Sequence, residues 1–172
     1  MYSDASFGDV ADCAGRLGWM LIDSAIARVA GLGPDSVKIF TADVQETDLE
    51  FAAPRITQIC LLELLPAWLA PFTSPAEFEH SDVIWFCDNE ASASIMARGT
   101  SSSSDLAGVV AKAHLCWMRC DARVWTEWID SKSNPSDGAS REGVRDAFAA
   151  AIGVQVRSLK LPELAQALRE VM

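Results

Sequence analysis

One segment does most to predict the fold: Val83-Ile84-Trp85-Phe86-Cys87-Asp88-Asn89-Glu90, where five apolar residues run without interruption into an acid. A short apolar run rich in β-branched and aromatic side chains predicts a strand that is buried on both faces. Open α/β sheets bind their ligands beyond the carboxyl ends of strands, so Asp88 is placed to face a site. The alternative is that Asp88 is a turn residue or the N-cap of the next helix.

Three strands are predicted before this segment. Tyr2-Ser3-Asp4 is typical of the last residues of a strand whose beginning is missing, so we expect a fragment or a domain of a longer protein. The next strands are predicted at Leu17–Ile22 and, after a turn at Ala30–Asp35, at Val37–Val44. Gly18 indicates a site where another stretch of backbone can approach closely. The short connections favour an antiparallel meander.

A helix is predicted from Pro54, because the missing N–H of proline is not needed in a first helical turn. The apolar face of this helix carries one acid, Glu63, which is costly to bury unless it is paired or binds a metal. Pro66 predicts a kink just after Glu63 or an early end of the helix. The face comprises Ile56, Ile59, Cys60, Glu63 and Ala67.

Further elements are predicted after the strand that ends at Asp88. A short helix covers Glu90–Arg98 and ends at a glycine, and the serine run Ser101–Ser104 leads into a longer helix. A fifth strand at Arg123–Ile129 is followed by a loop and a helix over Ser140–Ile152. The longer helix carries the apolar stripe Leu106, Val109, Val110, Ala113 and Trp117.

The last twenty residues predict a weak strand or loop at Val154–Leu159 and then a helix from Pro162. We therefore assign residues 1–152 to the main domain, and residues 153–172 to a C-terminal extension with an amphipathic helix. The apolar stripe of that helix is Leu161, Leu164, Ala165 and Leu168.

Composition limits the class of protein. A chain of 172 residues, half of them apolar and six of them Trp, predicts one globular domain. No apolar run approaches the roughly 20 residues that span a bilayer, and the N-terminus lacks the order of a signal peptide. Five cysteines without paired spacing indicate a reducing, intracellular (cytoplasmic or nuclear) location and not secretion. Cys116 and Cys120 are better explained as small buried hydrophobes than as metal ligands.

The formal charge of −10 is unusual for a protein that grips phosphates, because such proteins carry a basic patch. Four acids nevertheless stand at special positions: Asp4, Glu63, Asp88 and Asp137. Carboxylates that converge in one cleft repel one another and acquire raised pKa values unless cations neutralise them. Mg²⁺ prefers oxygen ligands, and two such ions can hold the attacking water and the leaving oxygen of a phosphodiester.

Four motifs resemble the ribonuclease H superfamily, and more narrowly the RNase H-like domains that accompany reverse transcriptases in retroelements. They span Tyr2 to Arg141 in the order of the family. The last is similar to the "N-x-A-D-x-x-S-R" ending of retroelement members. The motifs are Tyr2-Ser3-Asp4-Ala5-Ser6, Ile59-Cys60-Leu61-Leu62-Glu63-Leu64-Leu65, Phe86-Cys87-Asp88-Asn89-Glu90-Ala91 and Asn134-Pro135-Ser136-Asp137-Gly138-Ala139-Ser140-Arg141.

This resemblance implies an α/β fold with a five-stranded mixed sheet, in the order 3-2-1-4-5, and helices on both faces. It implies a metal-dependent endonuclease that hydrolyses the RNA strand of RNA–DNA hybrids, next to a covalently linked reverse transcriptase. Asp4, Glu63, Asp88 and Asp137 would hold two Mg²⁺ ions, with Mn²⁺ as a substitute. Two departures are a loop with Lys132 where many members carry a histidine, and the lack of the basic extension of cellular members.

Two alternatives stay open. One is a degenerate domain of the same fold that no longer cleaves and serves as a spacer beside a polymerase. The other is an unrelated α/β binding module whose acids are caps and solvated charges and lie far apart. The nuclease hypothesis requires that the strands containing Asp4 and Asp88 are adjacent and parallel, with the Glu63 helix in the connection between them.

Overall fold

The computed structural model describes residues 1–8, 13–164 and 167. Ala165 and Leu168 of the predicted C-terminal stripe lie outside the described residues, whereas Leu164 is buried in the main core. The strands are β1 Tyr2–Phe7, β2 Gly15–Ile22, β3 Val37–Val44, β4 Asp82–Cys87, β5 Arg123–Trp128 and β6 Val156–Ser158. The helices are α1 Ser24–Ala30, α2 Ile59–Thr73, α3 Glu90–Arg98, α4 Ser104–Arg119, α5 Asp137–Arg141 and α6 Ala147–Ala151.

The strands form one mixed sheet in the order β5-β4-β1-β2-β3-β6. Strands β1, β2 and β3 form an antiparallel meander, while β4 pairs in parallel with both β1 and β5. The predicted order of the first five strands is therefore confirmed, as is the parallel pair β1–β4 with α2 in its crossover. Within the described part of the chain the sheet has six strands and not five, because Val156–Ser158 in the predicted weak segment pairs in parallel with β3.

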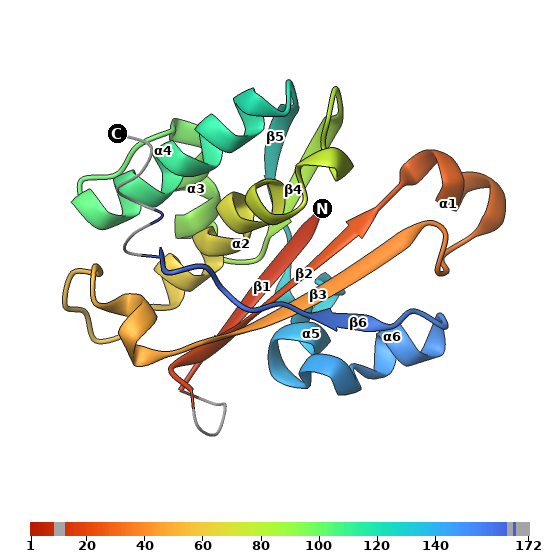
Figure 1. The fold of residues 1–172 in the computed structure, drawn as a ribbon, viewed down its shortest axis with the longest axis horizontal. Coiled ribbons are helices and arrows are strands. Elements are labelled where there is room, and N and C mark those ends of the chain that lie inside the picture. Colours follow the sequence, from red (N-terminus) through yellow and green to blue (C-terminus); the bar gives the residue numbers. More distant parts are fainter. Residues whose placement is uncertain (9–12, 165–166, 168–172) are drawn as a thin grey trace.

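Helices cover both faces of the sheet, as predicted (Figure 1). Helices α2, α3 and α4 lie on one face over the larger core, whose fully buried side chains include Trp19, Trp68 and Trp85. Helices α5 and α6 lie on the other face over a smaller cluster built around Met20 and Ile39. Among the described residues, no helix is long and apolar enough to cross a membrane.

The prediction that β4 is buried on both faces is wrong. Trp85 and Cys87 are fully buried under α2–α4, but Ile84 on the opposite face is 49% exposed. Helix α5 contacts β1, β2 and β3, so the second layer of helices does not extend over β4. The uninterrupted apolar run therefore has one buried face and one partly open face.

The predicted bounds of α2 are also wrong. The helix begins at Ile59, after a loop that contains Pro54 and a fully exposed Ile56. It then continues through Pro66 and Pro71 to Thr73, so the early end, one of the two alternatives predicted from Pro66, does not occur. An interior proline costs about 3 kcal/mol. The residues from Leu61 to Pro71 are all buried, and this burial offsets that cost.

The loop before α2 is held by a partly buried ion pair that has no sequence signature. The guanidinium of Arg55 donates two hydrogen bonds to Asp105 at the start of α4, with N–O distances of 2.6 and 2.7 Å. Arg55 also bonds Gln58, the N-cap residue of α2. These contacts fix the chain in a non-helical path where the sequence predicts the first turn.

The single helix predicted over Ser140–Ile152 is broken into α5 and α6. Gly143 adopts φ +60°, a left-handed conformation that ends a helix, and the side chain of Asp146 then accepts the backbone N–H groups that begin α6. Helix α1 was not predicted; it is seven residues long and buries none of them. By contrast, α3 has its predicted bounds and ends at Gly99 with φ +70°.

Candidate active site

The register of the sheet brings Asp4 and Asp88 together. Ser3 in β1 pairs with Cys87 in β4, and the two acids are the next residues of these adjacent parallel strands. We predicted that Asp4 ends its strand, and this is wrong. Strand β1 continues in antiparallel pairing with β2 as far as Phe7. Its partner in β2 is Gly18.

Asn89, and not Asp88, is the N-cap of α3. Its side-chain oxygen accepts the N–H of Ser92 at 3.0 Å. The capping role proposed as the alternative for Asp88 is therefore filled by its neighbour. The backbone oxygen of Asp88 accepts the indole N–H of Trp128 at 3.1 Å, which ties the end of β4 to the end of β5.

Glu63 reaches the same place from α2. The side chain is 3% exposed, and its Oε1 accepts the backbone N–H of Ala5 at 3.0 Å. The thiol of Cys87 donates to the other carboxylate oxygen at an S–O distance of 3.7 Å. Glu63, Cys87 and Asp88 each present a ligand atom, and these three atoms lie within 4.8 Å of one another.

A close backbone contact at Gly18 lets α5 lie over β1 and β2. A Cβ atom on Gly18 would stand 2.5 Å from the backbone nitrogen of Ser140 and 2.9 Å from the backbone oxygen of Ser136. The prediction of a close backbone approach at Gly18 is therefore confirmed. Thr41 of β3 holds the same segment by donating its hydroxyl to the Ala139 oxygen at 2.9 Å.

Side chains of the segment from Asn134 to Arg141 connect this segment, which carries Asp137, to Asp4 and its neighbours in β1. Ser140 is fully buried and donates its hydroxyl to the carboxylate of Asp4, while the Ser6 hydroxyl donates to the Ser140 oxygen at 2.9 Å. Asn134 donates its side-chain amide to the Ser3 oxygen at 2.8 Å. Asp137 begins α5, is partly exposed, and pairs with Arg141 at 2.7 Å.

The carboxyl groups influence each other electrostatically. The pKa of Asp4 is raised from 3.8 to about 7, mainly by burial and further by the charges of Asp88 and Asp137, although Ser140 and Arg141 oppose the shift. The pKa of Glu63 is raised well above its ordinary value, again mainly by burial and further by Asp4 and Asp88. We predicted a raised pKa in this group from like-charge repulsion, but burial is the larger cause.

Sequence reasoning missed the supporting side chains of this site. Cys87 precedes Asp88 in the strand and points into the main core next to Glu63, and burial raises the pKa of its thiol. Asn134 and Ser140 belong to the last of the four sequence motifs, but nothing in the sequence indicates which group each one contacts. These contacts join residues more than a hundred positions apart and appear only in the folded chain.

No family model and no curated protein sequence matches this chain. Among solved structures, RNase H1 from the halophilic archaeon Halobacterium salinarum NRC-1 is similar, with a TM-score of 0.56 and 16% sequence identity. The match covers 85% of this chain and 96% of that chain. A likeness at this identity shows the fold and not the activity. The chain therefore has the ribonuclease H-like α/β fold.

Proposed function

We propose that this chain is a metal-dependent nuclease that hydrolyses the RNA strand of RNA–DNA hybrids. One observation carries the proposal: Asp4 and Asp88 follow the paired residues Ser3 and Cys87 of adjacent strands, and Glu63 reaches the same place from α2. Neighbouring carboxylates add to the raised pKa values of Asp4 and Glu63. Buried carboxylates without a cation are unfavourable, and perturbed pKa values are typical of functional sites. The fold shared with an RNase H1 supports the proposal by analogy.

The donor atoms suit a hard divalent cation. Asp4, Glu63, Asp88 and Asp137 supply carboxylate oxygens, which are the ligands that Mg²⁺ prefers, and Mn²⁺ accepts the same set. The thiol of Cys87 is kept in its neutral form by burial, so it is a poor ligand for Mg²⁺. When bound, two divalent cations would activate water and stabilise the leaving oxygen of a phosphodiester.

The chain's own groups would hold the carboxylates in place for this chemistry. The N–H of Ala5 orients Glu63, the hydroxyl of Ser140 orients Asp4, and Arg141 orients Asp137. Such supporting hydrogen bonds fix the direction of a ligand's lone pairs. The net charge of −10 makes hybrid binding depend on cations, because phosphates would otherwise be repelled.

The proposal also concerns the larger protein to which this domain belongs. The resemblance of the Asn134–Arg141 segment to retroelement sequences supports a place in a retroelement polyprotein, beside a reverse transcriptase. Residues 1–152 would form the catalytic domain, and residues 153–172 an extension that contributes β6 to the sheet.

The test is a cleavage assay on a hybrid labelled in its RNA strand, with Mg²⁺, with Mn²⁺ and with a chelator. The parent chain is expected to cut the RNA strand only when a metal is present, and to leave duplex DNA intact. Asp88→Asn keeps the shape but removes a ligand charge, so cleavage should fall by more than about a hundredfold while the fold remains stable. Asp82→Asn at the other end of β4 makes the same change on an exposed residue and should retain activity.

Two outcomes would contradict this function. Cleavage that survives Asp88→Asn undiminished would mean that the carboxylates are not the metal site. A parent chain that folds but never cuts a hybrid with either metal would replace the nuclease with the degenerate domain of the same fold.

A further inference from the structure

The open face of β4 and β5 carries a patch of aromatic and aliphatic side chains. Trp125 is 66% exposed, and its partner in the parallel ladder, Ile84, is 49% exposed. Residues two positions apart in a strand share a face of the sheet, so Phe86 lies on this face as well. Its ring stacks on that of Tyr2 at 4.7 Å, and both residues are partly exposed. We call these four side chains the aromatic patch.

The same face of the sheet leads from the aromatic patch to the carboxylates. Asp4 follows Tyr2 by two positions, and Asp88 follows Phe86 by two positions. Helix α5 contacts β1, β2 and β3 on this face, and the sheet beyond it is open, as the exposed side chains of β4 and β5 show. The span from Ile84 to Asp88 is about 13 Å. A nucleic acid strand advances about 3.4 Å per nucleotide in a duplex, so this span equals about four nucleotides.

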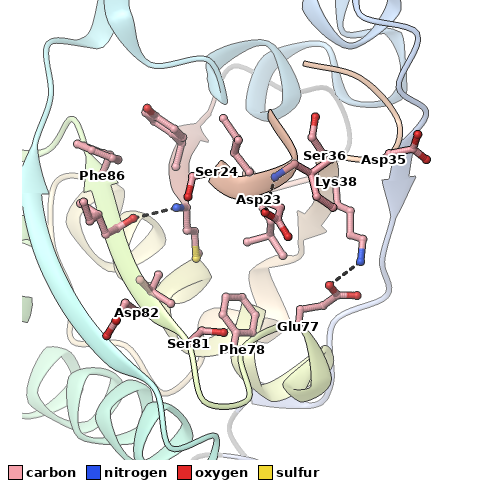
Figure 2. A pocket seen from close by; sticks show the side chains of 17 residues that line it. Asp23, Ser24, Asp35, Ser36, Lys38, Glu77, Phe78, Ser81, Asp82 and Phe86 are labelled. Atoms are coloured by element: carbon pink, nitrogen blue, oxygen red, sulfur yellow. Dashed lines mark hydrogen bonds and ion pairs between the residues drawn. The ribbon is translucent and has the colours of Figure 1, made fainter. Parts of the chain in front are cut away.

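A cavity of about 580 Å³ adjoins the aromatic patch, and three of the four patch residues line it. Figure 2 shows the cavity with Asp82 and Phe86 on one side and Asp23 and Lys38 on the other. Lys38 is engaged by Glu77 at 2.5 Å, so its charge is already balanced. The acids of this rim repel phosphate groups. A ligand of the aromatic patch must therefore bind through its flat or apolar surfaces.

The size and the chemistry of the aromatic patch favour nucleobases as its ligand. A stable protein interface takes about 20–30 residues from each partner. The patch has four residues and ends at the exposed ion pair between Arg123 and Asp82, so it is small for such an interface. Aromatic side chains on an open sheet stack unpaired bases in RNA-binding domains. Stacking needs no positive charge, which suits a chain with a net charge of −10.

We propose that the aromatic patch binds unpaired nucleobases, and that the substrate is a hybrid that continues into a single strand. The single strand would leave the hybrid near the carboxylates and lie along β4 and β5. A base would stack on the indole of Trp125, about four nucleotides from the cleavage site. The inference rests on the proposed function, because it takes a nucleic acid as the substrate. It concerns a separate surface, so a binding experiment without cleavage tests it by itself.

The first test measures binding of a single-stranded DNA oligonucleotide in Mg²⁺, because this strand offers bases but no RNA to cleave. The same strand made of abasic residues carries the same phosphates and is the reference. The parent chain should bind the base-bearing strand at least about fivefold more tightly than the abasic strand. Trp125→Ala should remove this preference, and Trp125→Phe, which keeps an aromatic face, should retain most of it. Met118→Ala, on an exposed apolar residue of α4, is the matched control and should keep the preference in full.

Three results would overturn the proposal: equal binding of the two strands, no measurable binding of either, or a preference that survives Trp125→Ala. Self-association of the parent chain that Trp125→Ala abolishes would equally overturn it, because a second copy of the chain would then cover the patch. A preference for bases in a chain that cuts no hybrid would support the binding site and remove the proposed nuclease. The two proposals can therefore fail separately.

Discussion

Metal-free protein should lose stability as the pH rises from about 4.5 to about 6, which is the reverse of ordinary acid denaturation. The pKa of Asp4 is 3.8 in the unfolded chain and about 7 in the folded one. Between these values the folded state holds a proton that the unfolded state has released. Each pH unit therefore removes stability, and stability from this group is fully present only below about pH 4.

The magnitude follows from the shift. One extra proton in the folded state lowers the free energy of unfolding by about 1.4 kcal/mol per pH unit. The loss between pH 4.5 and pH 6 is therefore about 2 kcal/mol. The pKa of Glu63 is raised for the same reason, so it adds to the slope in the same direction. Two groups have the opposite effect on stability, but neither contributes between pH 4.5 and pH 6. The Met1 amine, with a pKa of about 6, raises stability only above pH 6, and the lowered pKa of Asp105 matters only at acid pH.

The assay is urea unfolding followed by tryptophan fluorescence, with a chelator present, at several pH values in this window. In Asp4→Asn the group cannot titrate, so the slope should become shallower by about 1.4 kcal/mol per unit. Added Mg²⁺ should flatten the slope of the parent, because bound cations favour the ionised carboxylates. Stability that is flat or rises over this window, or a slope that survives Asp4→Asn, would refute the reasoning.

Two further predictions concern packing and pairing away from the carboxylates. Gly18→Ala should cost about 1–3 kcal/mol and reduce hybrid cleavage, because its Cβ would stand 2.5 Å from the Ser140 nitrogen and displace α5. Gly108→Ala in α4, where a Cβ meets nothing within 4 Å, is the matched control and should stabilise the chain. Urea unfolding and the cleavage assay are applied to both variants. Equal effects of the two substitutions would contradict the close contact between Gly18 and Ser140. Arg55→Ala should cost about 1–3 kcal/mol in urea unfolding, because it leaves the charge of Asp105, whose side chain is 3% exposed, without its counter-ion. Asp105→Asn added to this variant should restore part of the loss, and no recovery would mean that the charge is not the cause.

Local sequence patterns were sufficient for much of this fold. Strand β4, the antiparallel meander of the first three strands and the bounds of α3 with Gly99 at its end follow from apolar periodicity, caps and connection lengths. The order of the five strands was implied by the resemblance to the ribonuclease H superfamily. The four acids could be singled out because each one stands at an exceptional place in its pattern: Glu63, for example, lies on an apolar helix face. These signals are local, since they depend on residues within one or two turns or within a single strand.

The tertiary structure decided the features that depend on distant partners. Helix α2 starts late because Arg55 is held by Asp105, fifty positions away, and it continues through Pro66 because its residues from Leu61 to Pro71 are buried. Segment 156–158 becomes a strand only because the edge of β3 is available to pair with it. The raised pKa of Asp4 likewise depends mainly on its burial beneath α5. Burial and pairing are set by contacts between segments far apart in sequence, so no local pattern specifies them.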